Sequence, residues 1–171
     1  MNVVIATPRI SLRLLTPDDA AFLLELLNSP GWLQNIGDRG VKTIAAAQAY
    51  ASERIIKGYT ENGFGLYVMA LKGQDDIPIG LCGLIRRPGL EDVDIGFALL
   101  PQYMGQGYAF EAASAVMDHA RNSLKIPRIV AITLPTNSAS IKLLEKIGLR
   151  FERMANLPND PEELMLYGSN L

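Results

Sequence analysis

The stretch LLPQYMGQGYA, residues 99–109, decides the fold, because two glycines there separate an apolar strand-like segment from an alanine-rich one. Small and apolar residues recur at helical spacing after it, which predicts a helix from about residue 107 to residue 123. The first turn of a helix has free N–H groups and about half a positive charge, and glycine lets an anion approach the backbone. We therefore predict an anion-binding loop between a strand and a helix.

Two familiar phosphate loops do not fit this stretch. A Walker A loop needs Gly-Lys-Ser/Thr after its second glycine, but Tyr108 and Ala109 follow Gly107. A dinucleotide-binding turn needs a small residue where Phe110 stands, and an acid near the end of the next strand, residues 128–134, which has none. Triphosphate hydrolysis and NAD binding are therefore disfavoured.

Periodicity and turn residues predict the other elements. Residues 9–15 alternate Ile10, Leu12 and Leu14 with polar side chains, as in a strand with one polar face. We expect helices at 17–28, started by the Thr16 cap, and at 43–57, ended by Gly58, with a long loop at 32–41 between them. Strands at 64–71, 77–85, 93–100, 128–134, 151–154 and 163–167 and a helix at 138–147 complete a mixed α/β chain.

The strand at 93–100 also predicts a groove. If it is regular, residues 93, 95, 97 and 99 share one face, and Asp94, Gly96 and Ala98 share the other. The second face is shallow and holds one carboxylate, so a flat chain would fit along it, whereas a bulge would break the alternation.

Composition narrows the function classes. The 171 residues, 49% of them hydrophobic, fit one domain over residues 1–171, with no apolar run long enough to cross a membrane. The 16 Lys and Arg against 18 Asp and Glu give a net charge of −2 without a basic block, which argues against nucleic acid as a partner. With one cysteine, Cys82, one histidine, His119, and no secretory pattern, we expect a reduced, cytoplasmic protein without a zinc site.

The loop also carries a family resemblance. Gln102-Tyr103-Met104-Gly105-Gln106-Gly107 fits the Arg/Gln-x-x-Gly-x-Gly/Ala pattern of the GNAT superfamily of N-acetyltransferases, which this chain resembles. Residues 94–99, DIGFAL, look like that superfamily's fourth strand, and residues 137–148, NSASIKLLEKIG, look like its Asn-x-x-Ser/Ala helix. Residues 9–13, RISLR, resemble the opening strand of the ribosomal-protein N-terminal acetyltransferase subgroup, the RimJ and RimL type. The resemblance covers residues 9–151 and implies an α/β (α+β) fold with a mixed, mostly antiparallel sheet of about six or seven strands flanked by about four helices.

The resemblance implies acetyl-coenzyme A as co-substrate and no metal. In the superfamily the loop amides hold the diphosphate, the end of the fourth strand pairs with the pantetheine arm, and the helix-start asparagine contacts the cofactor near its thioester. Carried over to this sequence, the cofactor-binding residues are Phe97, Ala98, Leu99, Leu100, Gln102, Met104, Gly105, Gln106, Gly107, Tyr108, Ala109, Asn137 and Ser140.

The reaction implied is direct attack of a neutral amine on the acetyl thioester, with the Leu99 N–H among the donors to the oxyanion. Asp94 matches a strand-four acid of some members and is the candidate general base, a structural ion pair being the alternative. Many members have a tyrosine acid where this chain has Leu144, so Ser140 or water would protonate the departing thiolate. Cys82 lies in an apolar run and is expected to be a buried hydrophobe, not a nucleophile.

The acceptor amine is the least specified part. In the family the first long loop borders the acceptor pocket, so the candidate substrate-binding residues are Trp32, Asn35, Asp38 and Arg39, with loop packing as the alternative. A protein α-amine is favoured, because a pKa of ~7.7–8.0 leaves roughly 10–20% of it neutral at pH 7, against about 0.04% of a lysine. A small-molecule amine, a non-catalytic acyl-coenzyme A sensor, and a monomer or a homodimer all stay open.

Overall fold

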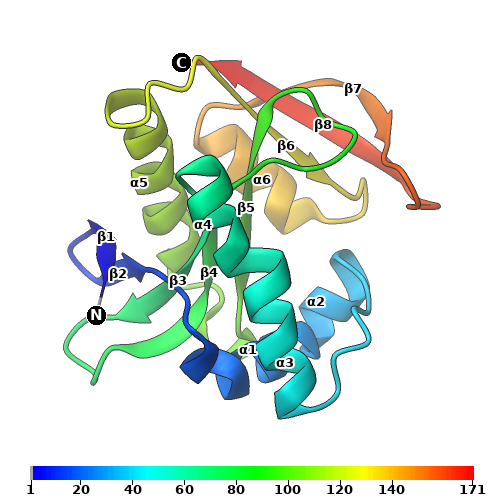
Figure 1. Cartoon of the computed structure of the whole chain (residues 1–171). Helices are drawn as coiled ribbons and strands as arrows, with labels where there is room; N and C mark the ends of the chain where they lie inside the picture. Colours follow the sequence, from blue (N-terminus) through cyan, green and yellow to red (C-terminus); the bar gives the residue numbers. More distant parts are fainter. Residues whose placement is uncertain (1) are drawn as a thin grey trace.

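The computed structural model describes residues 2–171, and an eight-stranded sheet lies at its centre (Figure 1). The strands lie in the order β1-β2-β3-β4-β5-β6-β8-β7, and every neighbouring pair is antiparallel except β5 with β6. Their bounds are β1 Val3–Ala6, β2 Ile10–Arg13, β3 Leu66–Leu71, β4 Ile77–Ile85, β5 Val93–Leu99, β6 Arg128–Thr133, β7 Arg150–Asn156 and β8 Glu163–Asn170. The predicted mixed, mostly antiparallel sheet is confirmed, and β1 is the one strand that sequence reasoning missed.

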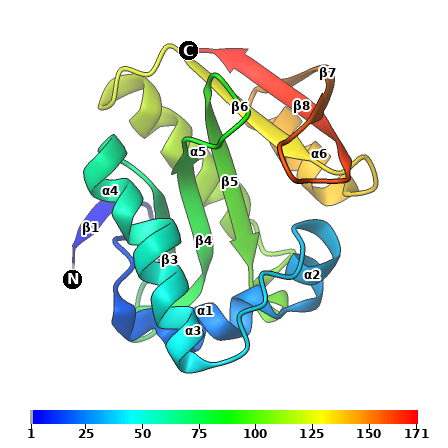
Figure 2. The ribbon, with the colours of Figure 1, turned by 45° about the vertical axis from the view of Figure 1, so that its right-hand side comes forward.

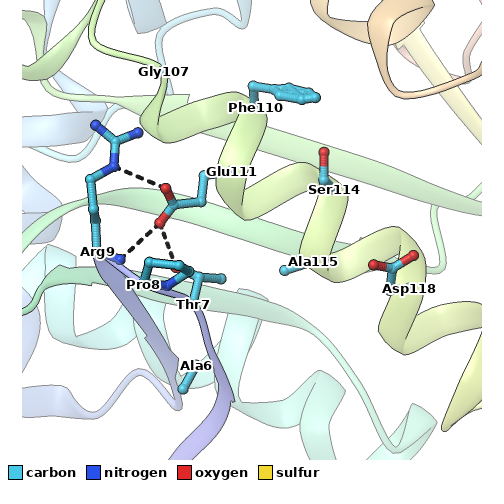
Figure 3. A pocket seen from close by; sticks show the side chains of 10 residues that line it. All are labelled: Ala6, Thr7, Pro8, Arg9, Gly107, Phe110, Glu111, Ser114, Ala115 and Asp118. Atoms are coloured by element: carbon cyan, nitrogen blue, oxygen red, sulfur yellow. Dashed lines mark hydrogen bonds and ion pairs between the residues drawn. The ribbon is translucent and has the colours of Figure 1, made fainter.

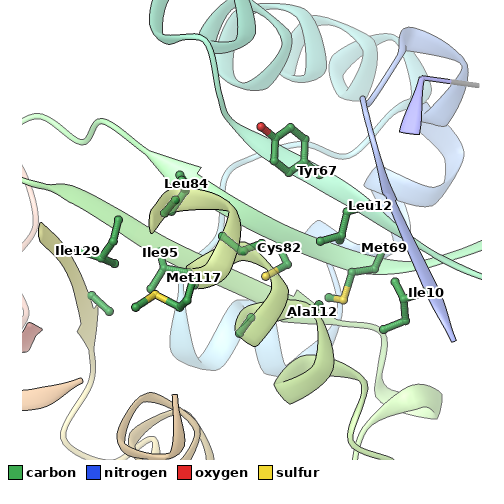
Figure 4. Packing of buried hydrophobic residues seen from close by; sticks show 14 of the residues in the cluster. Ile10, Leu12, Tyr67, Met69, Cys82, Leu84, Ile95, Ala112, Met117 and Ile129 are labelled. Atoms are coloured by element: carbon green, nitrogen blue, oxygen red, sulfur yellow. The ribbon is translucent and has the colours of Figure 1, made fainter. Parts of the chain in front are cut away.

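Helices cover both faces of the sheet, because side chains of successive strand residues alternate between two cores. Over one face lies α5 (Tyr108–Asn122), whose alanines pack against a core that includes Met69, Cys82 and Ile95 (Figure 4). The helix α6 (Ser138–Lys146) contacts α5 and β6. Over the other face, Val68 and Leu81 join a second core with α1 (Ala20–Leu27), α3 (Ile44–Tyr50) and the π-helical segment Ala51–Ile56 (Figure 2).

The expectation of a polar, half-buried face on the strand at 9–15 is wrong. Ser11 and Arg13 of β2 are both buried, because the second core covers that face too. Nη1 and Nη2 of Arg13 form a two-pronged ion pair with Asp19 there, at 2.9 and 2.7 Å, in the 3-10 helix Pro17–Asp19 that precedes α1, while the buried Nε has no hydrogen-bond partner among residues 2–171. The predicted helix start at Thr16 is confirmed, and Asp19 bonds back to the Thr16 N–H at 2.9 Å.

Two helix boundaries also differ from expectation. Residues 32–41 do not form one loop, because Ser29 and Pro30 begin a short helix, α2 (Pro30–Asn35). The helix capped by Thr43 does not end at Gly58 but continues through α4 (Lys57–Asn62) to Gly63, which has φ +80°. The packing of Tyr59 accounts for the extra turns, since its ring stacks on Tyr67 and its hydroxyl donates to the carbonyl of Leu66.

The remaining elements agree with expectation to within a few residues. The β3–β4 hairpin, the strands β5 to β8, and the helices α5 and α6 lie where periodicity placed them. Within residues 2–171 no helix is both long and apolar enough to cross a membrane.

Candidate functional site

In the sheet that residues 2–171 form, the one parallel pair of strands, β5 and β6, separates toward one end and leaves a wedge between them. β5 and β6 pair at Val93 with Ile129 and at Asp94 with Val130. Beyond these two pairs the strands diverge, and the described residues form no further pairs between them (Figure 2). β5 stays paired with β4 from Asp94, opposite Ile85, to Leu99, opposite Gly80, without a register shift. The wedge therefore lies between a well-held strand and one that turns away.

The backbone of β5 has polar groups that point into this wedge. The Leu100 N–H donates to the carbonyl of Ile79 at 2.9 Å, so residues 100 and 79 form a hydrogen-bonded antiparallel pair. Such pairs alternate along an antiparallel ladder, so the backbone groups of Leu99 and Phe97 point away from β4, toward the side where β6 has diverged. An open strand edge of this kind offers alternating donors and acceptors to an extended ligand with amide groups.

The predicted alternation of faces on β5 is confirmed. Ile95, Phe97 and Leu99 pack in the core beneath α5, whereas Ala98 packs in the core on the other side. Asp94 and Gly96 share the face of Ala98 by the two-residue period, and the unbroken pairing with β4 shows that no bulge interrupts it.

The loop after β5 has the backbone geometry expected of an anion site. A 3-10 turn, Pro101–Tyr103, follows the strand, and Gly105 and Gly107 then adopt left-handed conformations with φ +75° and +85°. Gly107 is the N-cap of α5, and the loop residues Gln102, Met104, Gly105 and Gln106 are exposed. A side chain at Gly105 would meet nothing within 4 Å, so space beside this backbone is open.

The start of α6 lies at the same edge of the sheet, because β5 and β6 are parallel and both end there. Asn137 is the N-cap of α6, and its Oδ1 accepts the N–H of Ser140 at 3.2 Å. Ser140 is half-buried on the first turn, and Leu144 is fully buried in the core. Leu144 therefore packs in the core at the position where many members of the resembled superfamily have a tyrosine acid.

The structure places Asp94 in the ion pair that the sequence left as the alternative to a role as general base. Asp94 is 1% exposed, and its Oδ2 accepts a hydrogen bond of 2.9 Å from Nε of Arg87, so the structural ion pair exists. Its Oδ1 is buried and has no hydrogen-bond partner among residues 2–171. Burial raises the pKa of Asp94, and the guanidinium of Arg87 opposes part of that rise. Sequence reasoning missed Arg87, for which no local pattern gives a signal.

The residues predicted to bind the amine substrate lie on α2 or just after it, and α2 packs against the glycine loop. A side chain on Gly31 of α2 would lie 3.4 Å from the methyl group of Met104, so α2 packs against the residues before Gly105. Trp32 is buried in the second core, on the face of the sheet that carries Asp94. Asn35 is half-buried and Asp38 and Arg39 are exposed, although Asp38 also bonds to the N–H of Gly40 at 2.8 Å.

Other titratable candidates lie outside this arrangement. Cys82 is fully buried, which confirms the expectation, and burial raises the pKa of its thiol to about 12. His119 is half-buried late in α5, as expected, and burial lowers its pKa. Among residues 2–171 no three His, Cys, Asp or Glu side chains cluster as metal ligands.

Comparison with known proteins gives a consistent picture. A family profile described as an acetyltransferase (GNAT) domain matches residues 9–150. The uncharacterized protein YkkB of Bacillus subtilis is 30% identical over 161 residues, which cover 92% of this chain and 91% of that one. An acetyltransferase from Agrobacterium tumefaciens shares the fold with a TM-score of 0.81 at 25% identity, over 99% of this chain and 94% of that chain. The RimL ribosomal L7/L12 alpha-N-protein acetyltransferase, solved in complex with coenzyme A, has a TM-score of 0.84 at 17% identity, over 99% of this chain and 98% of that chain.

Proposed function

The chain belongs to the GNAT acetyltransferase family, and on that premise we propose that it transfers the acetyl group of acetyl-coenzyme A to a primary amine, with a protein or peptide α-amine as the favoured acceptor. The observation that carries the proposal is the wedge between β5 and β6, which ends at the left-handed loop of Gly105 and Gly107. The open edge of β5 and the anion site of the glycine loop follow one another, so one extended ligand could contact both.

The residues present fit coenzyme A. The diphosphate would lie against the N–H groups of residues 104–109, which glycine leaves open and the helix dipole of α5 favours. The pantetheine amides would pair with the backbone of Phe97 and Leu99 along the wedge. Asn137 and Ser140 would border the thioester end, at the start of α6. When bound, acetyl-coenzyme A would supply the acetyl group as an activated thioester.

The proposed chemistry follows from the side chains near the wedge. The amine nitrogen attacks the thioester carbonyl, and the Leu99 N–H, which points into the wedge, donates to the oxyanion that forms. Asp94 Oδ1 takes the proton of the amine, directly or through water, while Arg87 holds the other oxygen. Collapse of the tetrahedral intermediate then breaks the carbon–sulfur bond, and Ser140 or water donates a proton to the departing thiolate.

Two considerations favour an α-amine as the acceptor: the pKa of the amine, and the face of the sheet from which it would enter. A base in an ion pair with arginine is a modest base, and an α-amine, with a pKa of ~7.7–8.0, asks less of it than a lysine does. The acceptor would enter on the Asp94 face, where Asn35, Asp38 and Arg39 contact it and Trp32 supports them from the core. A buried, reduced Cys82 and coenzyme A as substrate both suit the cytoplasm.

Two measurements test the proposal. Calorimetry with coenzyme A tests binding, and release of free thiol from acetyl-coenzyme A tests turnover with a panel of amines. The panel pairs a peptide that has a free α-amine with the same peptide N-acetylated but carrying a lysine, and adds small amines. We expect binding, with turnover on the free α-amine. Turnover on small amines alone would replace the acceptor class, binding without turnover would indicate a sensor, and no binding would refute the assignment.

A further inference from the structure

A charged cluster joins the amino-terminal hairpin to the first turn of α5 (Figure 3). Nε of Arg9 lies 2.9 Å from Oε1 of Glu111, and the backbone N–H of Arg9 donates to Oε2 at 3.1 Å. The hydroxyl of Thr7 donates to the same Oε2 at 2.6 Å. Thr7 and Arg9 lie about a hundred positions from Glu111 in the chain, so these bonds are tertiary contacts that join the β1–β2 hairpin to α5.

Arg9 also reaches the glycine loop itself. Its Nη1 donates to the carbonyl oxygen of Gln106 at 3.0 Å, and its guanidinium lies 4.4 Å from the ring centroid of Tyr108. A side chain added at Gly107 would lie 3.2 Å from Nη2. One planar guanidinium therefore contacts the loop and the first turn of α5 together, which a lysine ammonium cannot do with the same geometry.

The bond to Gln106 fixes the direction of one amide of the loop. In a trans peptide the carbonyl and the following N–H point in opposite directions. Because Arg9 holds the Gln106 oxygen on its own side, the N–H of Gly107 points away from Arg9, toward the open side of the loop. This N–H belongs to the set that would hold the diphosphate.

The ion pair between Arg9 and Glu111 offsets a negative charge that lies close to the proposed diphosphate site. A carboxylate in the first turn stabilises a helix, but near a bound diphosphate it repels the ligand. Partial burial alone would raise the pKa of Glu111, yet the bonds from Thr7 and Arg9 hold it below its usual value, so the group is ionised at neutral pH. The positive charge of Arg9 compensates it.

We propose that Arg9 is a positioning residue for acetyl-coenzyme A: it orients the Gln106–Gly107 peptide toward the diphosphate and compensates the charge of Glu111. The inference rests on the proposed function, since it assumes that the loop binds this co-substrate. Arg9 itself need not touch the ligand, because its contacts are with the loop and with α5.

The test uses Arg9→Ala and measures coenzyme A affinity by calorimetry and steady-state rates with two acetyl donors. A hydrogen bond to a charged group contributes enough that we expect Kd and KM for acetyl-coenzyme A to rise about tenfold or more, with kcat nearly unchanged. S-acetyl-pantetheine lacks the diphosphate, so its kcat/KM should be the same in the variant and the wild type. A merely structural role would lower both activities together.

Three further variants separate the two parts of the proposed role. Arg9→Ala/Glu111→Gln removes the uncompensated carboxylate and should recover part of the lost affinity, whereas Arg9→Lys keeps the charge and should fall between wild type and Arg9→Ala. Arg121→Ala is the matched control, because the Arg121 side chain is about as exposed as that of Arg9 and is likewise paired with a carboxylate of α5, Asp118, at 3.3 Å, but lies at the far end of that helix from the glycine loop. It should leave both donors unaffected.

The outcomes distinguish this inference from the function beneath it. If the wild type binds coenzyme A and Arg9→Ala binds it equally well, the positioning role is wrong and the proposed function stands. An equal loss with both donors would also overturn the positioning role. If the wild type does not bind coenzyme A, the proposed function fails and this inference fails with it.

Discussion

Replacing Gly105 by alanine should weaken coenzyme A binding about five- to thirtyfold. Gly105 has φ +75°, a conformation that costs an L-residue about 1–2 kcal/mol. The added methyl group itself meets nothing within 4 Å, so steric contact with the protein adds nothing to this cost. The backbone penalty is therefore the whole perturbation.

The penalty should appear in binding because of where Gly105 lies. The residues around it are exposed, so the free loop of the variant can relax to a backbone conformation that alanine prefers. Binding must then restore the left-handed loop, and the free energy spent in doing so is subtracted from the affinity. A penalty of about 1–2 kcal/mol corresponds to the factor given above.

The chain offers a closely matched control in Gly63. It has φ +80°, and a side chain there also meets nothing within 4 Å. Its N–H bonds to the carbonyl of Tyr59 at 3.1 Å at the end of α4, so Gly63→Ala should lower the free energy of unfolding by about 1–2 kcal/mol and leave coenzyme A binding unchanged. Calorimetry with coenzyme A and urea unfolding of both variants make the comparison.

The reasoning makes a specific demand of these two variants. If Gly105→Ala is folded and binds coenzyme A as tightly as the wild type, the left-handed loop is not the diphosphate site. If Gly63→Ala weakens binding as much as Gly105→Ala does, the effect is general destabilisation and not the geometry of the loop.

Three other outcomes are expected. Asp94→Asn should lower kcat/KM and remove the enzyme's acidic limb from the pH–rate profile; burial raises the pKa of Asp94, so the wild-type rate falls as pH drops through that raised value, and an identical limb in the variant would exclude Asp94 as the base. Asp19→Ala should lower the free energy of unfolding by about 3–5 kcal/mol, because it strands the buried Arg13. Burial alone would raise the pKa of Asp19, but the bonds from Arg13 and the Thr16 N–H hold it below its usual value. The difference in free energy of unfolding between wild type and Asp19→Ala should therefore be fully present above the usual aspartate range and shrink as pH falls through the depressed pKa. A difference that does not change with pH would contradict this. Cys82, with its pKa raised to about 12, should resist a thiol reagent in the native protein and react after denaturation, whereas rapid native labelling would show that it is accessible.

Local patterns predicted the parts of the fold whose causes are local. The period of the β3–β4 hairpin, the Thr43 cap and the glycines before α5 each act over a few residues, and each feature is found where the sequence placed it. The end of the helix after Thr43 was misplaced because the stop at Gly63 depends on Tyr59 stacking on Tyr67 of β3. A choice between two glycines was thus settled by tertiary packing.

The charged partners of the site were beyond sequence reasoning for the same physical reason. Asp94 was identified on its strand, but its ion pair with Arg87 depends on how the chain returns after β4. Arg9 was noted only as the start of a strand, and Glu111 lies 102 residues away on α5. Arg13 was expected to face solvent, but the second core covers it and Asp19 pairs with its charge there. These ion pairs are six, seven and 102 residues apart in the chain, and none of them has a period or a cap in the sequence to reveal it.

The proposed division of labour between backbone and side chains explains why so short a motif identifies the site. The diphosphate and the pantetheine would be held by N–H groups, which every residue except proline possesses, so the sequence must preserve only the φ angles of Gly105 and Gly107 and the opening of β5 from β6. Neighbouring side chains are then free to vary, provided that something keeps those amides in place. Arg9 would supply that constraint for the Gln106–Gly107 peptide. Substitution of a side chain in the loop, such as Met104→Ala, should therefore disturb coenzyme A affinity less than loss of Arg9, which lies outside the motif.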